Sequence, residues 1–145
     1  LPICPSLPVL FKLAEVLSVG VESFFSPRPG EVRGPVYPFI DAREMAFKDL
    51  PPGSISGHFL MPLDVEARVE PLLVEVPSGQ TVPLHFCHHK GEEMGFLISG
   101  YLEVLIGSAV HRLGPGDVLY LTSENPGQWR NSGVEPARLL WLKVK

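Results

Sequence analysis

The sequence predicts an all-β fold with a short helical segment ahead of the strands. Three observations support this prediction. The chain has 145 residues, which corresponds to one domain of roughly average size. Its 14 glycines and 16 prolines are typical of a chain with many turns and short strands. From Tyr37 onward no helical periodicity persists, and short apolar stretches alternate with turn-forming residues.

The composition excludes several classes of protein. With 45% apolar and 19% charged residues, the chain is not disordered throughout, and no apolar run is long enough to cross a membrane. A net charge of −4 argues against nucleic-acid binding by bulk charge. Two cysteines, Cys4 and Cys87, make a poor disulfide framework and favour a reducing cytoplasm. Because the sequence starts at Leu1 without a signal-peptide pattern, we expect it to begin inside a longer gene product.

Residues 1–25 predict a helix followed by one further turn. Four apolar residues recur at positions i, i+3, i+4 and i+7, as on one face of a helix: Leu10, Leu13, Ala14 and Leu17. Ser6 stands where an N-cap is expected, residues 18–20 would end the helix, and residues 21–25 would form the further turn. A helix and one turn are too small to bury their own apolar face. We therefore expect a partner or further residues to cover it.

Residues 26–36 predict a linker, because residues 26–35 alone contain three prolines and two glycines. Residues 37–145 then form the predicted β domain. Its apolar stretches recur about every 8–12 residues, which indicates a sandwich or barrel. The expected strands are 55–61, 71–76, 94–98, 101–106, 118–121 and 137–144, with turns at 77–79, 90–93, 99–100, 114–117, 124–127 and 131–133.

The densest polar cluster lies in residues 84–96, LHFCHHKGEEMGF. Side chains alternate along a strand, so His85, Cys87 and His89 would share one face, and His88 would point to the other. Imidazole, thiolate and carboxylate groups that converge in this way can bind a divalent metal. The alternative is a solvated strand that carries polar residues without a ligand.

A turn at Lys90–Gly91 would return the chain and bring Glu92 or Glu93 back beside this face. The carboxylate would then join the histidines and Cys87. The sequence contains no glycine-rich phosphate loop, no serine-nucleophile motif and no zinc CxxC pair that would point to a different chemistry.

Two motifs resemble those of the cupin family. Gly79, five residues, His85, then Glu93, six residues and Gly100 resemble the first cupin motif, and Gly116-Asp117 through Pro126 to Asn131 resembles the second. The stretches HKGEEMGFLISGYLEV, LGPGDVLYL and WRNSGVEPARLLW are similar to the cupin half of bacterial regulators that join a helix-turn-helix to a cupin sensor. Residues 1–25 resemble the last two helices of a repressor-type (Xre/Cro-like) helix-turn-helix domain. Together the resemblances cover nearly the whole chain.

The resemblance implies a fold and a metal-ligand set. The fold is an antiparallel cupin-type barrel, or jelly roll. The family's ligands are two histidines in a His-x-His, a glutamate after the turn, and a histidine near the second motif. His89 matches the second histidine and Glu93 matches the glutamate. Counting back from His89 places the first histidine at Cys87, whereas counting forward from Gly79 selects His85.

The fourth ligand position falls on Gly127, which has no side chain, and the neighbouring Gln128 would face outward on a regular strand. The full family metal set therefore cannot form. A reduced set of His85 or Cys87, His89 and Glu93, completed by water, would suit zinc or a similar divalent metal. Without metal, the same residues would hydrogen-bond a polar or anionic effector, with a protonated histidine supplying charge. Trp129 shares parity with Gly127, so if Gly127 faces the barrel interior, Trp129 would wall the pocket from the opposite side; the alternative is that Trp129 only packs in the core.

The resemblance implies a small-molecule-sensing domain of a bacterial transcriptional regulator in the cytoplasm, without enzymatic activity. The effector would enter the barrel, and only the full-length protein would bind DNA, because the recognition helix is absent here. We expect a homodimer, since the strands at 101–106 and 137–144 are apolar on both faces. One alternative is a small metal-dependent cupin enzyme, such as a dioxygenase or an isomerase. Another is a dimerisation module without a ligand.

Overall fold

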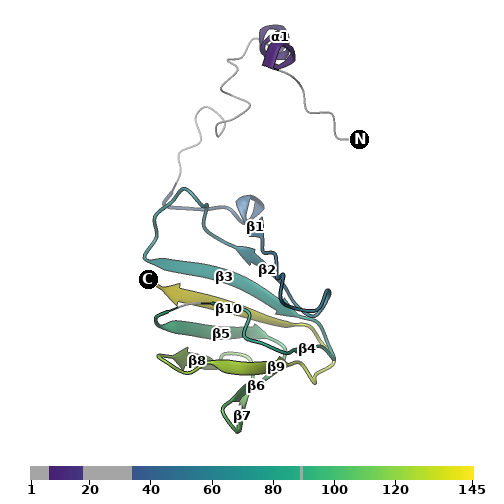
Figure 1. Ribbon diagram of the computed structural model, residues 1–145, viewed down its shortest axis with the longest axis vertical. Coiled ribbons are helices and arrows are strands. Elements are labelled where there is room, and N and C mark those ends of the chain that lie inside the picture. Colours follow the sequence, from purple (N-terminus) through teal and green to yellow (C-terminus); the bar gives the residue numbers. More distant parts are fainter. Residues whose placement is uncertain (1–6, 18–33, 89) are drawn as a thin grey trace. The chain divides into compact units, whose positions relative to one another are not determined.

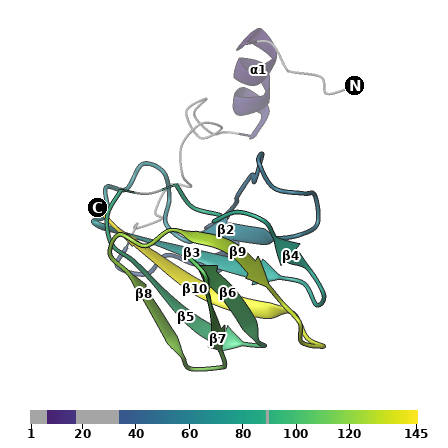
Figure 2. The same cartoon turned by 60° about the horizontal axis from the view of Figure 1, so that its bottom comes forward.

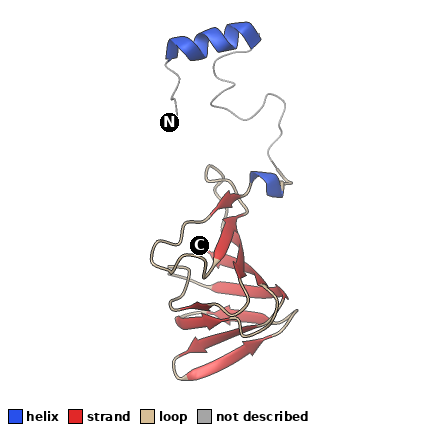
Figure 3. Ribbon diagram, turned by 90° about the vertical axis from the view of Figure 1, so that its right-hand side faces the viewer, coloured by secondary structure: helices blue, strands red, loops and turns tan. Residues whose placement is uncertain are grey.

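The computed structural model describes residues 7–17, 34–88 and 90–145 (Figure 1). The chain divides into two compact units, Leu1–Val36 and Tyr37–Lys145, which are described separately. Figure 3 shows that the helical residues described are confined to α1 and to the 3-10 turn η2, whereas the rest of the regular structure is strand.

In the first unit, α1 spans Leu7–Leu17, in agreement with the helix predicted from the apolar spacing. Leu13 and Leu17 of the predicted apolar face are exposed. The predicted N-cap Ser6, the helix end and further turn at residues 18–25, and residues 26–33 of the linker lie outside the described residues. None of the helices described is long and apolar enough to span a membrane.

The second unit begins with η2 (Phe39–Asp41) and continues as ten strands among its described residues. The strands are β1 (Arg43–Glu44), β2 (Ser56–Phe59), β3 (Val69–Val76), β4 (Thr81–Val82), β5 (Glu93–Ser99), β6 (Leu102–Ile106), β7 (Ala109–Leu113), β8 (Val118–Leu121), β9 (Pro126–Arg130) and β10 (Ala137–Val144). The predicted all-β class is therefore confirmed, and all six expected strands are present: those at 118–121 and 137–144 have the predicted ends, and the ends of the other four are shifted.

The strands form two antiparallel sheets that face each other (Figure 2). The six-stranded sheet has the order β1-β2-β3-β10-β5-β8, and the four-stranded sheet has the order β4-β9-β6-β7. Strands far apart in sequence are neighbours in this topology, since β10 lies between β3 and β5. Such crossing between sheets is what closes a double-sheet jelly roll.

The core lies between the two sheets and follows the period-two alternation of the strands. On β5, the odd-numbered residues Glu93, Gly95 and Leu97 are buried, whereas Met94 and Phe96 are exposed. The largest fully buried side chains are Trp129 and Trp141. Because both faces of the core are apolar and tightly packed, the sheets leave one end of the sandwich as the place where polar groups gather.

Asn131, the last residue of the second predicted motif, holds two segments of the fold together through hydrogen bonds. It is fully buried, and its Nδ2 donates to the carbonyls of Val76 (2.9 Å) and Glu135 (2.7 Å). Its carbonyl accepts the backbone N–H of Gly79, which has a φ of 77°. These bonds tie the end of β3 to the segment after β9, so the glycine and the asparagine of the two motifs hold one corner of the fold together.

Candidate functional site

The segment that carries the predicted site residues is a loop and not a strand. Residues 83–92 connect β4 of the four-stranded sheet to β5 of the six-stranded sheet. A single strand cannot belong to both sheets, and Pro83 offers no N–H for a ladder bond. The predicted alternation of faces is therefore wrong here, because His85, Phe86 and Cys87 are buried in succession. His88 is exposed, and His89 lies outside the described residues.

The loop nevertheless brings His85 and Glu93 together inside the sandwich. His85 Nε2 lies 2.7 Å from Glu93 Oε2, and both side chains are buried. Glu93 Oε2 also accepts the indole N–H of Trp141 at 3.0 Å, and His85 Nδ1 accepts that of Trp129 at 3.3 Å. We call these four residues, Trp129, His85, Glu93 and Trp141, the buried network.

The buried network assigns the proton on His85. An indole Nε1 can only donate, so His85 Nδ1 must be the acceptor and Nε2 must carry the hydrogen that is donated to Glu93. If Nδ1 also carried a proton, its N–H would point at the indole N–H of Trp129, and neither group could accept a hydrogen bond. The protonated histidine that was expected to supply charge to an effector would therefore have to be a residue other than His85, because both ring nitrogens of His85 are already hydrogen-bonded within the network.

Aromatic rings fill the interior around the buried network. The Trp129 and Trp141 rings are 5.6 Å apart at 87°, and Phe86 packs against both at 5.2 and 5.1 Å. The Trp129–Trp141 and Phe86–Trp141 pairs are edge-on, a favoured geometry for aromatic pairs, and the Phe86–Trp129 pair is tilted at 41°. Trp129 is fully buried and does not wall the main cavity, contrary to the expectation from parity with Gly127.

An irregularity in strand β9 explains why Gly127 and Trp129 do not share a face. Leu105 pairs with Gln128, but Ile106 pairs with Pro126, so Gly127 is an extra residue at a register shift between β6 and β9. A bulge of this kind interrupts the alternation of faces. Gly127 is exposed and does not line the main cavity, while Trp129 two residues later is buried.

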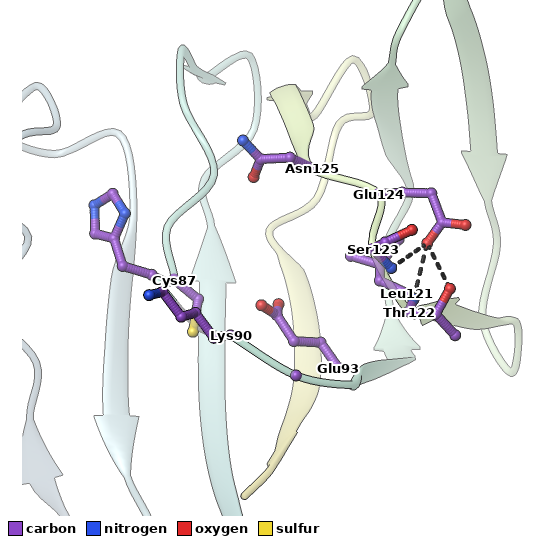
Figure 4. Close-up of a pocket in the computed structure, with 10 residues that line it drawn as sticks. Cys87, Lys90, Glu93, Leu121, Thr122, Ser123, Glu124 and Asn125 are labelled. Carbon is purple, nitrogen blue, oxygen red and sulfur yellow. Dashed lines mark hydrogen bonds between the residues drawn. The ribbon is translucent and has the colours of Figure 1, made fainter.

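The main cavity, of about 600 Å³, lies at the end of the sandwich beside Glu93. Its wall comes from three segments: the connecting loop, the start of β5 and the turn after β8. The lining residues are Cys87, His88, Lys90, Gly91, Glu93, Leu121, Thr122, Ser123, Glu124 and Asn125. Figure 4 shows the Glu93 side chain between the connecting loop and this turn, so its carboxylate borders both the buried network and the cavity.

Of the ten residues that line the cavity, the sequence analysis had placed two, Cys87 and Glu93, in the site. The turn at residues 121–125 was partly assigned as a simple separator of strands, and His88 and Lys90 were not included in the site. Register pairing of Glu93 with Leu121 brings this turn beside the connecting loop. The run of small polar residues after the strand at 118–121 was the available signal, because binding residues concentrate in loops at the ends of a rigid scaffold.

The turn after β8 is held by Glu124. Its Oε2 accepts the backbone N–H groups of Thr122 at 2.8 Å and Ser123 at 3.1 Å. Backbone N–H donors, its own first and then those of Thr122 and Ser123, lower the pKa of the Glu124 carboxyl. Figure 4 shows these bonds on the side of the turn away from Glu93. Glu124 therefore shapes the turn, and Glu93 is the carboxylate that lies between the two loops.

Cys87 differs chemically from what a thiolate ligand requires. The pKa of its thiol is raised to about 12, chiefly by burial; Lys143 opposes this rise, and the carboxylates of Glu93 and Glu70 add to it. The thiol is therefore protonated at neutral pH. A metal would have to displace this proton at a cost, since the thiolate is the ligand form.

A metal centre is not complete in the described part of the chain. There, no group of three or more His, Cys, Asp or Glu side chains is arranged to hold a metal. His85 and Glu93 are two oriented donors, but they already bond to each other, and Cys87 is a protonated thiol. Structural and catalytic zinc sites use at least three protein ligands. The described residues therefore do not fit the predicted metal, and the expected set depends on His89.

A family model for the cupin domain matches residues 72–143, from β3 to β10. The chain therefore has the cupin fold. The buried network and the cavity wall all lie within this range. No curated protein matches the chain in sequence.

Solved structures share this cupin fold at low sequence identity. A sugar phosphate isomerase of the cupin superfamily from Silicibacter pomeroyi is 18% identical with a TM-score of 0.62, over 77% of this chain and 76% of that one. The cupin domain of Cnp3 from Schizosaccharomyces pombe is 18% identical with a TM-score of 0.60, over 83% and 81%. The cupin domain of an XRE family transcriptional regulator from Enterobacter cloacae is 23% identical with a TM-score of 0.53, over 61% and 94%. At these identities the likeness shows the fold alone.

Proposed function

We propose that this cupin domain binds a small polar molecule and serves as the sensor of a bacterial transcriptional regulator. The observation that carries the proposal is the cavity of about 600 Å³ beside Glu93. This volume lies within the range of roughly 300–1,000 Å³ that is typical of small-molecule sites. The resemblance of residues 1–25 to a helix-turn-helix and the fold shared with an XRE family regulator's cupin domain support the regulatory role.

The lining indicates the chemistry of the effector. Lys90 and the exposed His88 lie on one wall and offer donors, and Glu93 offers an acceptor at the inner end. Thr122, Ser123 and Asn125 add hydroxyl and amide groups from the facing turn. A ligand with an anionic group near Lys90 and a hydroxyl or amino group that donates to Glu93 fits this arrangement. The effector would act on DNA only through the full-length protein, which we place in the cytoplasm.

Binding of such an anion is tested by calorimetric titration of the full chain with a panel of small phosphates and carboxylates. His88→Ala should weaken binding of the best ligand at least threefold, whereas His111→Ala should leave it unchanged. Both histidines are exposed, but His111 lies on β7 and does not line the cavity. Equal affinities for the two variants would contradict a ligand in this cavity, as would the absence of binding across the panel.

A reduced metal set of His89, Glu93 and either His85 or Cys87 belongs to the same proposal. The decisive variant is Glu93→Gln, with metal content and ligand affinity measured on the same sample. Any zinc bound to the unaltered chain should be lost in the variant, because a carboxamide is a weaker ligand than a carboxylate. The matched control is Glu75→Gln, which changes a half-exposed carboxylate on β3 that does not line the cavity. If metal content and affinity are the same in Glu93→Gln and in the unaltered chain, Glu93 is not part of a binding site.

A cupin isomerase is the second candidate function. The observation in its favour is the Glu93–His85 pair, which couples a carboxylate at the cavity to an imidazole behind it. Isomerisation of a sugar phosphate needs a group that removes and returns a proton, and a carboxylate can do this. The sugar phosphate isomerase named among the similar structures points in the same direction. Turnover of aldose phosphates that is lost in Glu93→Gln would favour this function over sensing.

A further inference from the structure

A second cleft, of about 90 Å³, lies where β1, β2 and β3 meet the loop that joins β2 to β3. Seven of its ten lining residues are apolar, and the other three are Arg43, Glu70 and Lys145. The acidic residues of the loop itself, Asp64 and Glu66, do not line it. At roughly 30 Å³ per water molecule, the cleft has room for about three waters or for a carboxylic acid of a few carbon atoms.

The register of the sheet places Arg43 beside this cleft. Arg43 of β1 pairs with Phe59 of β2, and Phe59 pairs with Leu72 of β3. Residues that pair across antiparallel strands lie on the same face, and Leu72 is fully buried between the sheets. Arg43 therefore lies at the edge of the inner face, where its guanidinium carbon is 5.2 Å from the centre of the Phe59 ring.

The Arg43 side chain has a hydrogen-bond donor that the described part of the chain does not satisfy. Its Nε is buried and has no hydrogen-bond partner there. An unsatisfied buried donor is unfavourable, and more so when the group is charged. Since protein atoms cover Nε, a ligand would reach it after a small rotation of the guanidinium that turns this N–H towards the cleft. An acceptor in the cleft would then remove the penalty.

Lys145 supplies further donors to the same cleft. Its side chain is 52% exposed, and its Nζ bonds to Glu70 Oε1 at 2.8 Å, which leaves two of its three N–H groups. Glu70 also bonds to Lys143 at 3.1 Å, and Lys143 pairs in register with Glu93 on its other side. With Arg43, these side chains comprise three cations and two carboxylates. One positive charge is left, and a monovalent anion would neutralise it.

We propose that this cleft binds a small organic monocarboxylate, such as a short-chain fatty acid. The carboxylate would accept hydrogen bonds from Arg43 and Lys145, and the hydrocarbon chain would lie against apolar walls that include Phe59 and Met61. A guanidinium suits this ligand because its N–H groups lie in one plane and can bond to both carboxylate oxygens. The inference is independent of the proposed function, because the cleft and the main cavity share no lining residue.

The test is an NMR titration of the full chain with sodium butyrate. The Arg43 Nε–H resonance, assigned by its loss in Arg43→Met, should shift as butyrate binds, and backbone amide shifts give the Kd of each variant. Arg43→Met should raise this Kd at least about tenfold, because methionine can still contact Phe59 but has no donor. The matched control is Arg138→Met, which should change the Kd by less than about twofold, since Arg138 lies on β10 and does not line the cleft.

The choice of ligand tests the proposed chemistry. Affinity should rise about fourfold for each methylene from acetate to butyrate, because each added group is buried against an apolar wall. Neutral n-butanol should bind at least about tenfold more weakly than butyrate, because it lacks the charge that Arg43 and Lys145 recognise. Inorganic phosphate should also bind more weakly than butyrate, because it has no apolar chain. Equal affinities for acetate and butyrate, or for butyrate and n-butanol, would contradict the proposal.

Three results with butyrate would overturn the site itself. They are an Arg43 resonance that does not shift, equal Kd values for Arg43→Met and Arg138→Met, and loss of binding in His88→Ala, which would place the anion in the main cavity. If circular dichroism shows that Arg43→Met does not fold, Ala67→Phe takes its place. This variant fills the cleft without changing its charge, and it too should raise the Kd at least about tenfold.

Discussion

Each residue of the buried network has a role that depends on atoms far away in sequence. Glu93 accepts bonds from His85, eight residues before it, and from Trp141, 48 residues after it. A carboxylate that is buried and doubly bonded in this way is held in one orientation, because rotation would break two bonds at once. At the scale of single residues, the site is therefore preorganised before any ligand enters.

Cys87 gives a prediction at the same scale. Because burial raises the pKa of its thiol from 9.0 to about 12, only a small fraction is thiolate at pH 8. In a Cys4→Ser background, we expect iodoacetamide to alkylate the folded chain about a thousandfold more slowly than the chain unfolded in guanidinium, since three pKa units correspond to that ratio of thiolate. Mass spectrometry measures both rates, and rates within tenfold of each other would show that Cys87 is accessible and ionised.

At the scale of elements, the site depends on a close approach between the backbone of β5 and a side chain of β10. Gly95 of β5 pairs with Trp141 of β10. A Cβ on Gly95 would lie 2.6 Å from two carbons of the Trp141 ring. Only a residue without a side chain lets the indole lie flat enough over β5 to reach Glu93.

Replacing Gly95 with alanine should therefore displace the Trp141 ring and weaken its bond to Glu93. We expect the free energy of unfolding to fall by about 1–3 kcal/mol, as for other substitutions that overfill a core. Gly127→Ala is the matched control, because its Cβ would meet nothing closer than the Leu105 carbonyl oxygen at 3.9 Å. Urea unfolding of both variants measures the difference, and equal stabilities would mean that the Trp141 ring is not confined by Gly95.

The differences between the predicted and observed elements show where prediction from the sequence fails. Strand β5 was predictable because residues 94–98 are a short apolar run between two turns, which is a local pattern. Strand β9 was not, because it starts with Pro126-Gly127 and resembles a turn. The loop at 83–92 was misassigned because its shape is set by the passage from one sheet to the other, which no local pattern records. His85 and Glu93 were predicted to meet, but the indole partners were not, since they depend on the packing of β9 and β10.

At the scale of the whole molecule, one cluster joins β3 to the end of β10. Glu70 accepts bonds from Lys143 at 3.1 Å and Lys145 at 2.8 Å. The Lys145 bond lowers the pKa of the Glu70 carboxyl most; burial opposes it, and the Lys143 bond and the two lysine charges add to the lowering. A carboxyl with a lowered folded-state pKa stabilises the fold above its unfolded pKa, and this stabilisation is lost as the pH falls through the folded value.

Glu70→Gln should therefore lower the free energy of unfolding by about 0.5–1 kcal/mol at pH 7 and by less as the medium is acidified. The figure is small because the side chain of Glu70 is 32% exposed, so solvent screens the pairs. Glu75→Gln is the control, because its partner Arg138 is 4.0 Å away and both side chains are about half exposed. Urea unfolding at pH 7 and near pH 4 provides the comparison. A Glu70→Gln effect that does not change between these pH values would rule out the ion pairs as its source.

The two tryptophans of the buried network can report on the site through their own fluorescence. The sequence contains two tryptophans, Trp129 and Trp141, and the indole N–H of each bonds to one member of the His85–Glu93 pair. Indole emission responds to the polarity and hydrogen bonding around the ring. All of the tryptophan fluorescence therefore comes from side chains that are hydrogen-bonded to His85 or Glu93, and no indole elsewhere in the sequence adds background. A ligand that draws Glu93 towards the cavity would change that emission without any label attached to the protein.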